Sequence, residues 1–172
     1  MPASSEPVLL NQTRERKQES DTTLTAVRRI LLLTFILAAC GTGIELMLVG
    51  HIEDAWQWVP QALLLISIVL LLFYAVSRRP LYMRFFQLTM FLFMISGVVG
   101  IWLHYQSKVE FKLELNPSLH GLDLFLDAIK GATLPPVLAP GMMIQLGLVG
   151  LVYSFRHPAL LTNTKKNEPV EL

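Results

Sequence analysis

Apolar residues along this chain gather in four blocks that are separated by shorter polar stretches. The blocks lie at residues 30–50, 58–77, 84–104 and 134–156. Each is close to the roughly 20 apolar residues that an α-helix needs to cross the hydrocarbon core of a bilayer. The pattern therefore predicts an all-α membrane protein in which residues 27–158 form a bundle of four transmembrane helices.

The two ends of the chain differ from these blocks. Residues 1–26 are rich in Ser, Thr and charged side chains, and residues 159–172 have the same polar character. Segments of this kind cannot bury enough apolar surface to offset the entropy that is lost on folding. We therefore expect a disordered cytoplasmic tail over 1–26 and a second cytoplasmic tail over 159–172.

The connection over residues 105–133 begins with a regular alternation. Polar and apolar residues alternate over 108–115, and this period of two predicts a short strand. The apolar face of that strand comprises Val109, Phe111, Leu113 and Leu115. Because no second segment has a strand pattern, its backbone groups would have to pair with a partner protein or with a second copy of the chain. The alternative is an extended segment that bonds to water.

The rest of this connection has the period of a helix. Apolar residues recur every three to four positions after Asn116 and Pro117, at Leu119, Leu122, Phe125, Leu126 and Ile129. Such a stripe predicts a short amphipathic helix that lies flat on the outer membrane interface. The apolar stripe would then contact lipid or the bundle.

Basic residues are divided unequally between the two sides of the predicted bundle. Of the 14 lysines and arginines, only Lys108, Lys112 and Lys130 lie in the 105–133 connection. Cytoplasmic segments of membrane proteins have the excess of Lys and Arg, so we expect both termini in the cytoplasm and the connection outside. A compact chain without targeting signals predicts a protein of the bacterial inner, or plasma, membrane.

Composition narrows the class of protein. Charged residues make up 16% of the chain and the formal net charge is +1, whereas a soluble domain has roughly 25% charged residues. An ordinary soluble domain is therefore not expected. Nucleic-acid binding is not expected either, because there is no broad basic stretch. Cys40 is the only cysteine, so neither an intrachain disulfide nor a CxxC motif is present.

Small residues indicate how the predicted helices pack, because they let helix backbones approach closely in lipid. The candidates for close packing are Gly41, Gly97, Gly100, Gly147 and Gly150. They lie in the first, third and fourth apolar blocks. The second block is rich in Leu and Ile, so we expect it to be the most exposed to lipid.

Glu45 is the one acidic or basic residue well inside a predicted span. It shares a helix face with Ala38, Gly41 and Thr42, so we expect its carboxylate to point into the bundle. A carboxylate within a membrane is costly and is a functional candidate by default. The alternative is that Glu45 lies near enough to the outer surface to reach water or to anchor another helix.

His51, Glu53 and His104 are expected at a similar depth near the outer face. Imidazole and carboxylate groups could hold a divalent metal ion there, and two imidazoles could hold a haem iron. The alternative is that these side chains only form hydrogen bonds at the interface. No HExxH, G-x-S-x-G or phosphate-binding loop accompanies them, so the sequence gives little support to enzyme activity and predicts no catalytic residue.

These patterns lead to two hypotheses of function. The first is a non-catalytic accessory or scaffolding subunit of a larger membrane complex, with the bilayer and a protein partner or second copy as its contacts. The second is a membrane protein with a metal, haem or proton site near the outer face, which would serve electron transfer, metal handling or ion movement. A metal analysis and an absorbance spectrum would separate the two.

Overall fold

The computed structural model describes residues 6–50, 55–130 and 138–161, and every element in these ranges is a helix. The elements in chain order are α1 (Glu6–Leu48), the 3-10 helix η1 (Ala55–Gln57), α2 (Trp58–Ser77), α3 (Pro80–Leu115), α4 (Gly121–Lys130), α5 (Leu138–Ser154) and α6 (Pro158–Leu161). The all-α class expected from the sequence is therefore confirmed for the described residues.

Three of these helices are long and apolar enough to cross a membrane. Their apolar stretches lie within Asn11–Leu48, Ala55–Ser77 and Pro80–Leu115. The fourth apolar helix, α5, has 17 residues, and the apolar stretch within it is the shorter segment Pro140–Ser154. Residues 134–137 of the expected fourth span lie outside the described residues, so a fourth membrane crossing stays a prediction.

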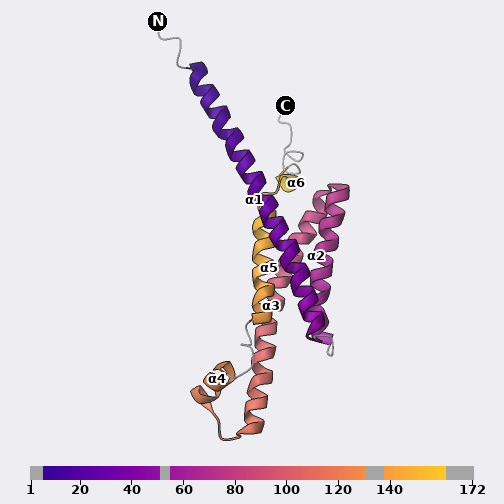
Figure 1. Ribbon diagram of the computed structural model, residues 1–172, viewed down its shortest axis with the longest axis vertical. Coiled ribbons are helices and arrows are strands. Elements are labelled where there is room, and N and C mark those ends of the chain that lie inside the picture. Colours follow the sequence, from indigo (N-terminus) through magenta and orange to yellow (C-terminus); the bar gives the residue numbers. More distant parts are fainter. Residues whose placement is uncertain (1–5, 51–54, 131–137, 162–172) are drawn as a thin grey trace, which may run out of the picture.

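Successive long helices run in alternating directions (Figure 1). As a result, the N-terminal part of α1 projects beyond α6 at one end of the molecule, and α3 continues past the other end of the bundle, where α4 lies beside it. Helix α5 packs against both α3 and α1, and α2 packs against α3. The four helices therefore form an antiparallel bundle.

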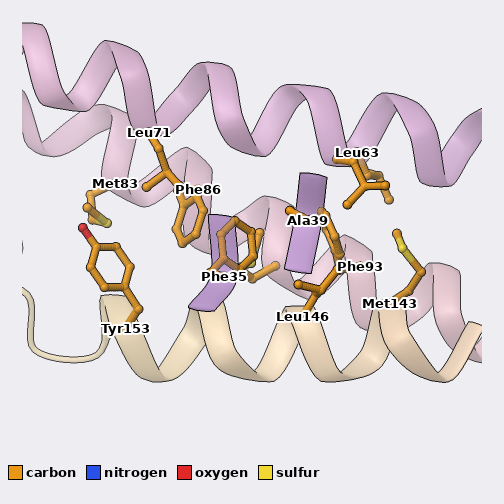
Figure 2. Close-up of a cluster of buried hydrophobic side chains, with 12 residues drawn as sticks. Phe35, Ala39, Leu63, Leu71, Met83, Phe86, Phe93, Met143, Leu146 and Tyr153 are labelled. Atoms are coloured by element: carbon orange, nitrogen blue, oxygen red, sulfur yellow. The ribbon is translucent and has the colours of Figure 1, made fainter. Parts of the chain in front are cut away.

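Aromatic and methionine side chains fill the centre of the bundle (Figure 2). The buried ring of Phe35 on α1 lies 5.3 Å from the ring of Phe86 and 6.4 Å from that of Phe93, both on α3. Phe86 in turn meets Tyr153 of α5 edge to face at 6.0 Å. These edge-on contacts join three helices in one core and fix the rotation of α1 about its axis.

Helices α3 and α5 come into close contact through glycines on both of them. A Cβ placed on Gly97 would lie 2.7 Å from the carbonyl oxygen of Pro140, and one on Gly147 would lie 2.8 Å from that of Met90. Gly100 and Gly150 are similarly close to Pro140 and Met90, respectively. The missing side chains thus allow the two backbones to approach as small residues do in membrane helix pairs.

Gly41 differs from these four glycines. A Cβ at Gly41 would meet nothing within 4 Å, and the residue is exposed on α1. The buried positions of α1 are Phe35, Ala39 and Thr42, so the packed face is turned away from Gly41. The prediction of a packing role for Gly41 is therefore wrong.

The strand expected over residues 108–115 is also wrong, because this segment forms the last two turns of α3. Leu, Lys and Glu favour helix, and a helix pairs the backbone groups that a lone strand would leave unsatisfied. In the helix, Val109 and Leu113 are half-buried while Phe111 and Leu115 are exposed, so the expected apolar face does not exist. The helix ends where Asn116, which precedes a proline, is extended.

The N-terminal segment differs from the expected disordered tail in the same way. Helix α1 already begins at Glu6 and continues without a break into the first apolar block. Its polar part contains good helix formers such as Glu, Gln, Arg and Lys. Thr22, Thr23 and Thr25 donate hydrogen bonds to the carbonyl groups four residues earlier, so their hydroxyl groups are satisfied within the helix.

Candidate functional site

A cavity of about 540 Å³ lies at the end of the bundle where α1 ends and α2 begins. Its walls come from α1, η1, α2, α3 and the start of α5. The lining residues are Leu46, Trp56, Gln57, Val59, Pro60, Leu63, Leu92, Ile95, Ser96, Val99, Gly100, Leu103, His104, Ser107, Pro140 and Met143. We refer to it as the His104 pocket.

Polar groups gather at one end of this pocket. On α3 the lining extends from Leu92 to Ser107, which is about 22 Å at 1.5 Å per residue. From Leu92 to Leu103 the wall is apolar apart from Ser96, whereas His104 and Ser107 lie at its other end, and η1 adds Gln57. The pocket is therefore amphipathic along its length, as ligand sites with a few orienting polar groups are.

The sequence spacing of α3 explains why His104 faces this pocket. Gly100 and Ser107 lie four residues before and three residues after it, so the three residues share one helix face. His104 is half-buried. Its imidazole can donate and accept a hydrogen bond in its neutral form, or donate two when protonated. Among the candidate ligands that the structure describes, His104 is the one that lines a cavity.

Glu45 does not point into the bundle as expected, because its side chain is exposed. The buried stripe of α1 contains Phe35, Ala39 and Thr42, and Glu45 lies about 90° away from the centre of that stripe at 100° per residue. The small residues near Glu45 suggested a different packing face, but the large ring of Phe35 determines which face is buried. Glu45 is also absent from the walls of the His104 pocket.

The expected group of metal or haem ligands cannot be assembled from the described residues. His51 and Glu53 lie outside the described residues. Within residues 6–50, 55–130 and 138–161, there is no group of three or more His, Cys, Asp or Glu residues that could hold a metal ion. His104 alone remains at the predicted location.

Sequence reasoning missed Gln61, which lies in the first turn of α2. Gln61 is 8% exposed, and its Nε2 atom has no hydrogen-bond partner among the described residues. An unsatisfied buried donor costs about 1–3 kcal/mol. In the sequence, Gln61 is a polar residue directly after Pro60 at the start of an apolar block. Polar residues are common at the start of such helices, so this position alone does not indicate a functional role.

Beyond the bundle, the continuation of α3 and helix α4 form a projecting unit, which we call the arm (residues 101–130). Tyr105 of α3 meets Phe125 of α4 at 5.9 Å, and Lys112 forms a salt bridge of 3.0 Å with Asp127. Ala128 is the buried residue of α4. Leu122, Phe125, Leu126 and Ile129 of the predicted apolar stripe of α4 are exposed, so this stripe is not covered by the bundle and its contact with lipid stays a prediction.

Comparison with known proteins gives no relative for this chain. No family model matches it, and no curated protein or solved structure matches it either. Its function therefore has to be inferred from its own residues and their geometry.

Proposed function

We propose that this chain is an accessory subunit of a larger membrane assembly and that its arm binds the extramembrane part of a partner protein. The observation that supports this proposal is the set of large apolar side chains that the arm leaves exposed. Beyond Tyr105 they are Phe111, Leu115, Leu122, Phe125, Leu126 and Ile129. Leu115 and Leu122 are 68% and 70% exposed, and exposed apolar side chains outside a membrane often belong to interaction sites.

The length of α3 favours a protein partner over lipid for this surface. Its 36 residues correspond to about 54 Å of helix, whereas a bilayer with its headgroups is about 40–45 Å thick. If α3 enters the membrane near Pro80, the end of the arm lies beyond the headgroups on the other side. Leu115 at that end would face water, whereas the contact of Phe125 with Tyr105 places this part of α4 about 38 Å from Pro80, at the depth of the headgroups. A partner that covers these side chains gains roughly 25 cal/mol for each Å² of apolar surface removed from water.

The orientation belongs to the same proposal. Basic residues lie mainly at the end of the bundle opposite the arm, which supports cytoplasmic termini and an arm outside the plasma membrane. This orientation requires α5 to cross the membrane as the fourth span. We propose the bacterial inner membrane as its location, with the partner contacting the arm from outside.

Copurification with a matched control tests the partner proposal. The chain is purified in mild detergent as the wild type, as Leu122→Ser with Phe125→Ser, and as Leu24→Ser, which removes a similarly exposed leucine from the opposite end. We expect one stoichiometric partner with the wild type and Leu24→Ser, and its loss with the arm variant. A wild-type chain that elutes without a partner and without self-association would contradict the proposal, as would equal recovery of the partner with the folded arm variant.

The His104 pocket supports a second candidate function, in which the chain binds a small amphipathic molecule. A mainly apolar stretch of about 16 Å along α3, from Leu92 to Leu103, leads to the polar end of the pocket at His104, Gln57 and Ser107. A long apolar tail and a hydrogen-bonding head would therefore both find partners. His104 is also where a haem or divalent metal ion would be held in the alternative hypothesis. An absorbance spectrum and a metal analysis of the purified protein test those two ligands. Lipid extraction followed by mass spectrometry tests the amphipathic one, with His104→Ala expected to lose it.

A further inference from the structure

At the end of the bundle opposite the arm, arginines from three separate parts of the chain lie close to one another. Arg28 belongs to α1, Arg78 follows α2, and Arg156 follows α5. The Nη2 atom of Arg28 donates a hydrogen bond of 2.9 Å to the backbone carbonyl oxygen of Arg156. This bond joins α1 to the turn after α5 and holds the guanidinium of Arg28 at the junction of the two.

Aromatic rings lie next to these arginines. The ring of His157 is 5.3 Å from that of Tyr74 and 5.6 Å from that of Tyr153. The guanidinium carbon of Arg78 lies 5.8 Å from the centre of the Tyr74 ring, within the range of a cation–π contact. Arg78, Tyr74, His157 and Tyr153 therefore form a continuous row that spans the ends of α2 and α5.

The positive charge of this cluster is not balanced by acidic side chains in the described part of the chain. The one salt bridge found there joins Lys112 to Asp127 in the arm, at the other end of the molecule. Burial and the positive charges of Arg28 and Arg78 lower the pKa of His157, so the fields of both guanidinium groups reach the same ring. The positive charges of Arg28 and Arg78 both act at the imidazole of His157, which is neutral when its pKa is lowered. A bound anion would therefore be stabilised by both guanidinium groups.

With both termini in the cytoplasm, as proposed above, the cluster would lie at the depth of lipid headgroups. Arg28 comes two residues before the first apolar block, and Arg78 comes directly after α2. The exposed side chains next to them, Ile30 and Val76, are apolar. An anionic group bound here could therefore have acyl chains that extend along these residues into the bilayer, and this distinguishes a lipid from a soluble anion.

We propose that Arg28 and Arg78 bind the phosphate of an anionic membrane lipid beside Tyr74 and His157. A guanidinium group has five N–H donors, and the described contacts of Arg28 use its Nη2 atom on the Arg156 carbonyl. Its remaining donors and those of Arg78 can form charge-assisted hydrogen bonds to phosphate oxygens. The site differs from ordinary cytoplasmic basic residues because two elements position the two arginines around shared aromatic rings.

The neighbouring arginines provide matched controls. Arg29 and Arg79 are each one residue further along the chain and are exposed, so Arg29→Gln and Arg79→Gln remove the same charge from the same end of the bundle. The test variants are Arg28→Gln and Arg78→Gln. Arg78→Gln keeps the Arg28 hydrogen bond to Arg156, so it remains informative even if Arg28→Gln does not fold.

The experiment uses the full chain in a neutral detergent after lipid has been removed. Thermal unfolding is followed while phosphatidylglycerol, phosphatidylcholine or inorganic phosphate is added. We expect phosphatidylglycerol to raise the Tm of the wild type more than phosphatidylcholine or inorganic phosphate does. Arg28→Gln and Arg78→Gln should each weaken phosphatidylglycerol binding about tenfold, and Arg29→Gln and Arg79→Gln should change it by about twofold or less.

Two results would overturn the proposal. Equal losses of phosphatidylglycerol binding in Arg78→Gln and Arg79→Gln would mean that the lipid responds to diffuse charge and not to a built site. A rise in Tm with inorganic phosphate but none with phosphatidylglycerol would show that the bound anion is not a lipid headgroup.

Discussion

At the scale of single residues, the contrast between Gly150 and Gly41 shows what a helix contact requires. Both are glycines within apolar helices, and the small-residue pattern gives them the same role. A Cβ at Gly150 would overlap the side chain of Met90, whereas a Cβ at Gly41 would meet nothing within 4 Å. The sequence indicates that close helix contacts are possible at glycines. Which of the glycines form them depends on the large side chains, such as Phe35 on α1, that determine which face of each helix is buried.

The same contrast gives a mutational prediction. Gly150→Ala should destabilise the bundle by about 1–3 kcal/mol, because the added methyl group forces Met90 and Phe86 away from their packed positions. Gly41→Ala should leave stability unchanged or raise it by up to about 1 kcal/mol, because alanine favours helix more than glycine does. Unfolding curves of both variants in one detergent measure the difference. Equal stability of the two variants would show that α3 and α5 are not in close contact.

The sequence also predicts the surroundings of His104 and Glu45 with different success, because these depend on how each helix is rotated about its axis. The sequence predicts His104 near the outer face, and it lines the pocket with Gly100. Glu45 was assigned to the interior from the small residues beside it, yet Phe35 turns α1 so that Glu45 is exposed. The sequence gives the residues on each face but not the rotation of the helix, which depends on contacts between distant segments.

His157 gives a prediction about pH. Burial and nearby positive charge lower its pKa below the ordinary value of 6.5, and its Nδ1 accepts a hydrogen bond of 3.3 Å from the backbone N–H of Ala159. The charged and titratable groups around its ring are Arg28, Arg78, Tyr74 and Tyr153. Because the unfolded chain then binds a proton at a higher pH than the folded chain, stability is full above about pH 6.5 and falls as the pH falls through the folded pKa.

Replacement of the histidine isolates this effect. His157→Gln removes this imidazole and leaves the other three histidines in place, so the free energy of unfolding of the variant should decrease less than that of the wild type between pH 7 and pH 5. Unfolding in neutral detergent without lipid measures both curves. Curves that stay parallel over this range would contradict the lowered pKa.

At the scale of elements, three apolar helices were predictable because their blocks are long enough to leave no soluble alternative. The helical arm was not predictable from the sequence. The alternation of polar and apolar residues over 108–115 indicates a strand, whereas the residue types in this segment favour a helix. The segment forms a helix because α3 already supplies the preceding turns. Extending an existing helix avoids the cost of nucleating a new element.

The attachment of α4 to α3 is testable within this arm. Ala128 is fully buried between them, so Ala128→Leu should overpack the contact and weaken it by about 1–3 kcal/mol. Lys112→Met removes a partly exposed salt bridge and should cost at most about 1 kcal/mol. Hydrogen exchange of the α4 amides measures both changes. Faster exchange in Lys112→Met than in Ala128→Leu would mean that charge, and not packing, holds the arm together.

At the scale of the whole molecule, the antiparallel bundle separates two chemically different ends. One end has the arm and the His104 pocket, and the other has the arginine–aromatic cluster. The proposed partner needs the arm to be outside, and the proposed lipid site needs the basic end to face the cytoplasm. The arm precedes α5, so its side depends on the first three helices. The lipid site includes His157, which follows α5, so it also needs α5 to cross the membrane, and the described α5 is shorter than the other three helices.

Cysteine accessibility tests this topology most directly. Cys40 is the only cysteine, so Cys40→Ser gives a background for Ser20→Cys in α1, Ser118→Cys in the arm and Leu161→Cys in α6. A membrane-impermeant maleimide should label Ser118→Cys on intact cells and should label the other two only after permeabilisation. Labelling of Ser20→Cys and Leu161→Cys from opposite sides would show that α5 does not cross the membrane, and would contradict the four-span account.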